Sequence, residues 1–196
     1  MQRTISSLHD CAVCGSDGDI GRIRDVCFDP SAWAIRHLVV ETGSSLAHRR
    51  VLVSPSSVDR FLDDGRALQT LLARPQASSG PAASGLRNAS ALLGYHLQAL
   101  DGAIGHVEDF VFDDSCWAIR YLCIDTHSWW PGAKTVWITS SWIGGIDWRS
   151  REVRTLLSRR AVKQHQADHP SSFADLSEGK RRVDTALTAS TLGNTP

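Results

Sequence analysis

The sequence predicts an all-β protein of two tandem small β-barrels that pack with pseudo-two-fold symmetry and are followed by a polar C-terminal tail. The main observation is a repeat: residues 101–126 copy residues 17–42 at a constant offset of 84, with 14 identical positions. Such self-similarity indicates a tandem duplication. Within each copy, short runs rich in aromatic and β-branched residues alternate with turn sequences, which is typical of all-β domains.

The repeat predicts two domains. We expect the first copy at 7–74, a linker at 75–90 and the second copy at 91–170, with a loose leader at 1–6 and a disordered tail at 171–196. The linker is rich in Pro, Gly, Ser and Ala, and the tail is polar and without periodicity. A copy of about 75 residues is near the size at which one core becomes marginally stable. We therefore expect the copies to pack on each other or on a partner chain.

Both copies are expected to contain the same series of strands. Asp17-Gly18 and Asp29-Pro30-Ser31-Ala32 indicate turns. Gly21, like Gly105 in the second copy, interrupts a strand and predicts a bulge or a close backbone approach. The strands expected in the first copy are Ser7–Gly15, Ile20–Phe28, Trp33–Thr42, Val51–Val53 and Ala67–Leu72, with a turn or single helical turn at Ser56–Phe61. The corresponding later elements of the second copy are expected at 136–138, 140–146 and 152–157.

The hairpin between the second and third strands predicts two charge pairs. If its turn is symmetric, Asp25 lies opposite Arg36, and Asp109 lies opposite Arg120 in the second copy. A carboxylate beside an arginine can be catalytic, but opposite charges across two strands also fix their register. We interpret both as structural pairs.

Both faces of this hairpin carry apolar side chains, whereas a half-exposed sheet has one apolar face. One face is therefore expected to fill the barrel and the other to contact the equivalent face of the other copy. The residues of this second face are Val26, Phe28, Trp33 and Ile35, with Phe110, Phe112, Trp117 and Ile119 in the second copy.

Composition and motifs disfavour several classes of function. Lys plus Arg equals Asp plus Glu, 21 of each, so no global field attracts nucleic acid, and nucleic-acid binding is not expected. Neither a signal peptide nor an 18-residue apolar run is present, which predicts no membrane span and a cytoplasmic location. The histidines and the five cysteines have no metal-site spacing, and no catalytic or nucleotide motif occurs. We expect no metal, no cofactor and no catalytic residue.

Tryptophan is distributed unevenly between the copies. Trp33 and Trp117 are equivalent and are expected to be structural, but five further tryptophans occur in the second copy alone. Aromatic side chains in a loop are common anchors of protein interfaces. The alternative is that these rings cover the end of the barrel. The residues proposed to bind a partner are Trp129, Trp130, Pro131, Gly132, Trp142 and Trp148.

These motifs together resemble the PRC-barrel family, and most closely stand-alone bacterial proteins with two such barrels. The related domains are the barrel of the photosynthetic reaction-centre H subunit and the C-terminal domain of the ribosome maturation factor. In the second copy the resemblance is carried by D-G-x-I-G-x-V-x-D-F at 101–110, W-x-I-R-Y-L at 117–122 and W-W-P-G with Lys134 at 129–134. The first copy keeps residues 17–42 and Ser54-Pro55 but has Ser45-Leu46-Ala47-His48 in place of the tryptophan loop.

The resemblance implies a surface for assembling proteins, without shared catalytic residues. We therefore expect a non-enzymatic adaptor that binds another protein, and self-association is left open. Basic residues that follow Trp148, such as Arg149, Arg151 and Arg154, keep an RNA- or ribosome-associated factor as the alternative. An enzyme with an unrecognised site is the third option.

Overall fold

The computed structural model of the chain describes residues 1–43, 49–62, 65–72, 85–127, 129 and 135–164. Across these ranges the protein is predominantly β-stranded, with α1 (Arg159–Gln164) as the one α-helix, so the all-β class is confirmed. The helices found within these ranges are all too short or too polar to cross a membrane. The expected tail at 171–196 lies outside the described residues.

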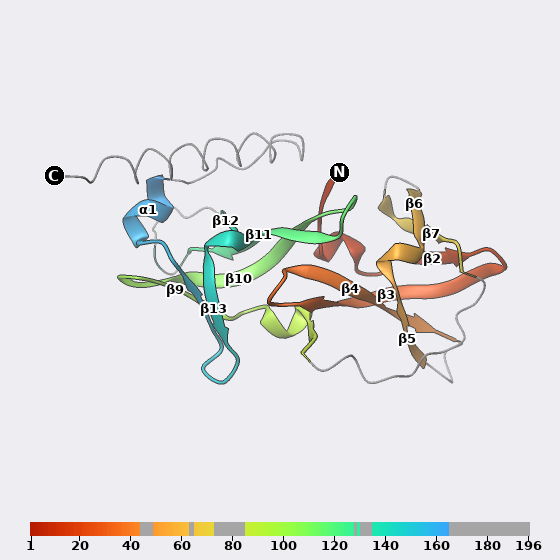
Figure 1. The fold of residues 1–196 in the computed structure, drawn as a ribbon, viewed down its shortest axis with the longest axis horizontal. Coiled ribbons are helices and arrows are strands. Elements are labelled where there is room, and N and C mark those ends of the chain that lie inside the picture. The colour runs from red at the N-terminus through yellow and green to blue at the C-terminus, as the bar shows by residue number, and fades with distance from the viewer. Residues whose placement is uncertain (44–48, 63–64, 73–84, 128, 130–134, 165–196) are drawn as a thin grey trace.

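The two halves contain the same elements in the same order (Figure 1). The first half consists of β1 (Gln2–Thr4), the 3₁₀ turn η1 (Ser6–Leu8), β2 (Ala12–Gly15), β3 (Gly18–Asp29), β4 (Ala34–Thr42), β5 (Arg49–Val53), η2 (Pro55–Ser57), β6 (Val58–Leu62) and β7 (Ala67–Thr70). The second consists of β8 (Arg87–Asn88), η4 (Ala89–Leu92), β9 (His96–Ala99), β10 (Gly102–Asp113), β11 (Ala118–Asp125), β12 (Thr135–Thr139), η5 (Ser140–Trp142), β13 (Ile143–Asp147) and β14 (Glu152–Thr155), followed by α1.

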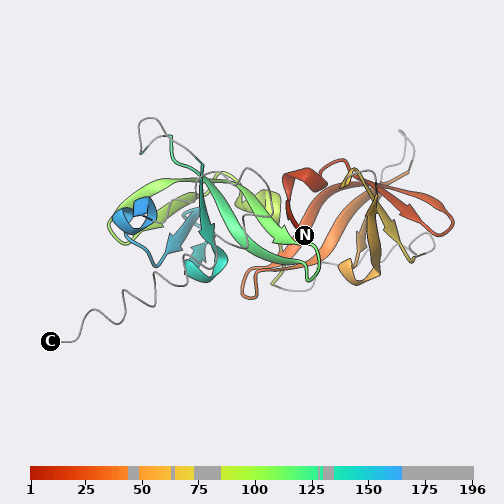
Figure 2. The ribbon, with the colours of Figure 1, turned by 90° about the horizontal axis from the view of Figure 1, so that it is seen from above.

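One hydrogen-bonded sheet runs through both halves. Its strand order is β13-β14-β9-β10-β11-β4-β3-β2-β7-β6, with β1 and β12 paired to β10 and β11, and with β5 and β8 paired to β4 and β3. The path ends at β13 and β6 and does not close on itself. The halves join where Ala34 of β4 pairs with Ala118 of β11. The β3–β4 and β10–β11 hairpins overlap at the centre of the molecule, and each reaches over the other half (Figures 1 and 2).

Glycine allows a close backbone approach at equivalent places in the two halves, as the sequence predicts. A Cβ atom on Gly21 would lie 2.1 Å from the carbonyl oxygen of Glu41, and one on Gly105 would lie 1.9 Å from that of Asp125. The residue before each glycine is an extra residue in its strand, because the register shifts there. Such bulges increase the local bend and twist of a strand.

The hairpin turns place a tryptophan in the left-handed region, with φ of 51° at Trp33 and 57° at Trp117. This conformation is rare for a bulky residue. It directs the backbone toward the other half: Ile35 N–H donates to the Trp117 carbonyl at 2.8 Å, and Ile119 N–H donates to the Trp33 carbonyl at 2.6 Å. Trp33 thus belongs to the turn, and the predicted strand Trp33–Thr42 begins one residue later.

The predicted charge pairs Asp25–Arg36 and Asp109–Arg120 are wrong. Asp25 faces Val39 across β3 and β4, and Asp109 faces Cys123 across β10 and β11. The arginines instead form ion pairs with the aspartates four residues after the predicted ones. Arg36 lies 3.5 Å from Asp29, and Arg120 lies 3.4 Å from Asp113. The register differs because the turn is not symmetric about Asp29–Ala32, and because both hairpins contain bulges.

The beginnings of the two halves are exchanged. Residues 1–6 are not a loose leader, since β1 pairs with residues 111–113 of β10 in the second half. Reciprocally, β8, which lies in the expected linker, pairs with Cys27 and Phe28 of β3 in the first half. Arg3 also donates to Asp114 at 2.9 Å. Residues 75–84 of the expected linker lie outside the described residues.

One apolar core extends across both halves. At its centre, the rings of Phe28 and Phe110 lie 6.2 Å apart, so the second hairpin face is covered by the other half. Trp33 stacks on Phe28 at 5.7 Å, and Trp117 stacks on Phe112 at 5.3 Å. Phe28, Phe110 and Phe112 are completely buried. Burial of a large apolar side chain contributes about 1.5–3 kcal/mol, which favours a fixed arrangement of the halves.

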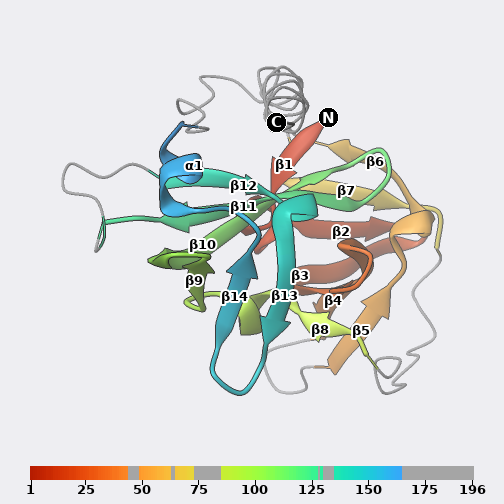
Figure 3. The same ribbon diagram turned by 60° about the vertical axis from the view of Figure 1, so that its left-hand side comes forward.

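Three further elements differ from the expectation. The segment Ser7–Gly15 contains the turn η1 before β2. The helical turn expected at Ser56–Phe61 is present as η2, but the segment continues as the strand β6. Helix α1 was not expected. It lies on the second half, where Arg159 donates to the Ala103 carbonyl at 2.7 Å (Figure 3).

Candidate functional site

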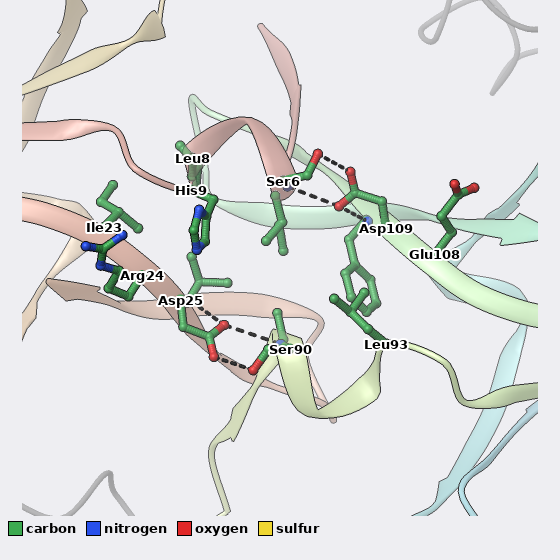
Figure 4. A pocket seen from close by; sticks show the side chains of 14 residues that line it. Ser6, Leu8, His9, Ile23, Arg24, Asp25, Ser90, Leu93, Glu108 and Asp109 are labelled. Atoms are coloured by element: carbon green, nitrogen blue, oxygen red, sulfur yellow. Dashed lines mark hydrogen bonds between the residues drawn. The ribbon is translucent and has the colours of Figure 1, made fainter. Parts of the chain in front are cut away.

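A pocket of about 200 Å³ lies where the two halves meet. It is lined by η1 and β3 of the first half and by η4 and β10 of the second (Figure 4). Most lining residues come in pairs of equivalent positions, including Ser6 with Ser90 and Asp25 with Asp109. The pocket therefore exists only because the two halves are packed together.

Two reciprocal hydrogen-bonded contacts flank the pocket, and we call them the Ser–Asp clamps. Ser6 of the first half donates its hydroxyl to Asp109 Oδ2 at 2.5 Å and its backbone N–H to Oδ1 at 3.1 Å. Ser90 of the second half donates its hydroxyl to Asp25 Oδ2 at 2.5 Å and its N–H to Oδ1 at 3.3 Å. Each clamp joins a 3₁₀ turn of one half to the central strand of the other (Figure 4).

A second register shift lies directly before each aspartate, between Ile23 and Asp25 in β3 and between Val107 and Asp109 in β10. Each Oδ1 also accepts the N–H of the following residue, from Val26 at 2.8 Å and from Phe110 at 2.8 Å. Burial raises the pKa of the Asp109 carboxyl, whereas the hydrogen bonds from Ser6 and Phe110 act in the opposite direction. The nearby Glu108 carboxylate raises this pKa further.

Carboxylates dominate the charge around the pocket. The arginine that lines it, Arg24, donates from Nε to Glu41 at 2.7 Å and from its terminal NH1 group to Asp10. Two carboxylates therefore balance its positive charge. The exposed Glu108 accepts from the Thr135 hydroxyl at 3.3 Å. His9 Nδ1 lies 3.1 Å from Asp10. The pocket is therefore polar and negative at its rim.

The floor of the pocket is apolar. Ile23, Val26 and Phe110 are buried there, and Leu93 is an exposed part of the wall, with 40% of its surface accessible. Concave sites with apolar walls and a few converging polar groups are the usual form of a binding site.

The predicted partner-binding tryptophans do not form one surface in the described part of the chain. Trp142 is buried, and its carbonyl accepts from the Thr155 hydroxyl at 3.0 Å and from Leu156 N–H at 2.8 Å. The ring therefore belongs to the core, because η5 carries it inward. Trp130, Pro131 and Gly132 lie outside the described residues.

The two other predicted tryptophans are half-buried and have different neighbours. Trp129 packs on the core, with Lys163 Nζ 4.8 Å and the Arg159 guanidinium 5.7 Å from its ring centre. Trp148 lies edge-on to Tyr95 at 5.8 Å and beneath Arg87 at 5.2 Å. Both rings thus pack against the core on one side and are covered in part by basic side chains on the other.

The pocket was not predicted, although the sequence carries a weak signal for it. Arg3, Ser6 and Leu8 recur as Arg87, Ser90 and Leu92 at the same offset of 84, upstream of the block that reveals the duplication. Metal binding gains no support, since within the described ranges no three His, Cys, Asp or Glu side chains are grouped as potential ligands. No family model matches the chain, and no curated protein matches it.

Proposed function

We propose that this protein is a non-enzymatic adaptor, built from two PRC-type barrels with approximate two-fold symmetry, that binds another protein at the junction of its halves. The observation that carries the proposal is the pocket formed between the halves. An assembly surface needs a fixed shape, and the single core and the Ser–Asp clamps hold the two halves in one arrangement.

The barrel assignment rests on the sequence motifs and on the equal series of elements in the halves. In each half, the strand after the central hairpin continues through one 3₁₀ turn into the next strand, as η5 joins β12 to β13. These two strands are not hydrogen-bonded to each other, so the covalent chain connects them at the point where the sheet of each half is open. The approximate two-fold symmetry rests on reciprocal contacts, namely the two clamps and the Ile35–Trp117 and Ile119–Trp33 hydrogen bonds.

The test is affinity purification of the tagged protein from its native cells, with two matched variants. Leu93→Arg places a long cation at the wall of the pocket, and Leu100→Arg makes the same change at a position that is 73% exposed and does not line the pocket. We expect a specific partner that is retained by the wild type and by Leu100→Arg but lost from Leu93→Arg. Equal retention by both variants would reject the junction as the binding surface.

An RNA-associated function is the second candidate, because Trp148 and Tyr95 carry Arg87 and Arg151 on their rings. Aromatic rings beside cations can stack and bind single-stranded nucleic acid. Retention of RNA that falls steeply between 50 and 200 mM salt, and that is lost in Arg87→Gln, would favour this candidate. Capture of a protein after nuclease treatment would favour the adaptor.

A further inference from the structure

Among the polar features in the described part of the chain, the junction pocket combines a cavity with acidic lining residues and an apolar floor. Its volume of about 200 Å³ is below the range of roughly 300–1,000 Å³ of drug-sized ligand sites. The pocket is thus suited to a single extended side chain or a similarly small molecule.

The charge of the lining residues favours a cation as the ligand of the pocket. Asp25, Asp109 and Glu108 line the pocket, and the guanidinium of Arg24 is directed to Glu41 and Asp10. An incoming anion would be repelled by the Asp25 and Asp109 carboxylates, which are partly shielded from solvent, and by the exposed Glu108 carboxylate at the rim. A cation would meet them favourably.

The two clamp aspartates retain hydrogen-bonding capacity. A carboxylate has about four acceptor positions. Within the described residues, Asp25 accepts from Val26 N–H and from the N–H and hydroxyl of Ser90, and Asp109 accepts three equivalent bonds. Each carboxylate can therefore accept one further donor.

The apolar floor of the pocket favours an organic cation with a hydrocarbon part. Val26, Phe110 and Ile23 offer apolar surface, which favours a hydrocarbon stem with a charged end over a bare metal ion. Lysine and arginine are built in this way, since they bury their methylene stems while the charged group stays near polar partners.

We propose that the junction pocket binds the ammonium or guanidinium of a lysine or arginine side chain from a partner polypeptide, with the stem on the apolar floor, the cation between Asp25 and Asp109, and Glu108 adding negative charge at the rim. This inference rests on the proposed adaptor function, and it identifies the partner by a basic residue that inserts into the pocket.

The experiment titrates the full-length protein with defined probes and follows backbone ¹H–¹⁵N signals. Ser6 and Ser90 are the reporters, because their N–H groups donate to the two carboxylates. The peptide probes are acetyl-Gly-Arg-Gly-amide and acetyl-Gly-Lys-Gly-amide, with acetyl-Gly-Gln-Gly-amide as the neutral control. Butylguanidinium and butanol test the side chain without a peptide. We expect the basic peptides to shift both reporters with a Kd of about 1 mM, a value typical of one small contact, and the glutamine peptide to shift neither.

Charge-matched variants locate the binding. Asp25→Asn and Glu108→Gln are each expected to weaken the arginine peptide about threefold or more. The controls are Asp59→Asn and Glu152→Gln, which remove the same charges at residues that do not line the pocket. Asp25→Asn also removes a clamp charge, so its folding is checked by the remaining amide spectrum. Glu108→Gln keeps the test decisive if Asp25→Asn unfolds.

Each outcome decides between the possibilities. Equal weakening by the pocket variants and their controls would overturn the proposal, as would equal binding of the arginine and glutamine peptides. Binding of butylguanidinium without binding of either basic peptide would assign the pocket to small amines and overturn the polypeptide partner. Because the titrations use no cellular partner, they can succeed where affinity purification fails. If Leu93→Arg loses the captured partner but no basic peptide binds the wild type, the adaptor function is supported and the insertion of a basic side chain is rejected.

Discussion

Removal of one hydroxyl from a Ser–Asp clamp should destabilise the whole molecule. In Ser6→Ala, Asp109 keeps the backbone N–H groups of residue 6 and Phe110 but loses a hydroxyl donor at 2.5 Å. A hydrogen bond to a charged group contributes about 1.5–3 kcal/mol, and the exposure of Ser6 to solvent places the expected loss at the lower end of that range. For a chain of this length, the melting temperature should fall by about 3–6 °C. Ser90→Ala should behave alike, because it makes the equivalent contact to Asp25.

The pH dependence identifies the carboxylate as the cause. Burial raises the pKa of Asp109 above its unfolded value, so ionisation of this group lowers stability as pH rises through the folded pKa. The Ser6 hydroxyl offsets part of this loss by favouring the ionised form. Ser6→Ala raises the pKa further, so its destabilisation is largest at pH 7 and smaller at pH values below the unfolded pKa.

The assay is urea unfolding followed by tryptophan fluorescence at pH 7 and at pH 3.5. Ser141→Ala is the control, because Ser141 is exposed and its hydroxyl contacts Thr139 at 3.2 Å within its own half. If the two clamp variants unfold at the same urea concentration as Ser141→Ala, the clamps do not stabilise the junction. If the loss is equal at both pH values, it does not arise from the carboxylate.

Three other predictions test the fold. Gly105→Ala should lower stability by about 1–3 kcal/mol or more, because its Cβ would lie 1.9 Å from the Asp125 carbonyl oxygen. The control is Gly145→Ala, whose Cβ meets nothing within 4 Å and which should be neutral or slightly stabilising. Equal melting temperatures of the two variants would refute the close approach at Gly105. Trp142→Ala should lower the free energy of unfolding by about 3–5 kcal/mol, since the ring is buried. An unchanged midpoint in urea would show that the ring is not part of the core. Of the thiols, exposed Cys116 should react with iodoacetamide in minutes at pH 8, while Cys123 should not react until the protein unfolds, because burial strongly raises its pKa; mass mapping of early alkylation at Cys123 would contradict this.

The sequence predicts the repeated series of elements well, because duplication shows the same pattern twice. The glycine bulges at Gly21 and Gly105 follow from that pattern, since only a missing side chain permits the approach to the next strand. The hairpin register was not predictable in the same way. It depends on a left-handed conformation at Trp33 and Trp117, which the chemistry of tryptophan does not favour and which contacts between the halves support.

The pocket could not be located from local patterns. Its walls are 3₁₀ turns and strands from opposite halves, and the segments β1 and β8 that bring the turns into place have only three and two residues. Runs this short carry no readable periodicity. For the tryptophans, count and position are visible in the sequence, but burial is not. Trp142 follows the serines of η5 and turns inward, so a ring interpreted as a partner anchor lies in the core.

The exchange of β1 and β8 also determines when the protein can fold during its synthesis. The first half leaves the ribosome with a strand whose partner in β10 is about 110 residues away, as the Arg3–Asp114 contact shows with its separation of 111. Until β10 is made, β1 has no partner there, and until β8 is made, β3 lacks the strand that pairs with Cys27 and Phe28. Contacts of such separation form slowly. Completion of the first half is therefore tied to translation of the second, and a nascent chain halted before residue 87 exposes the apolar surface around Phe28 to chaperones.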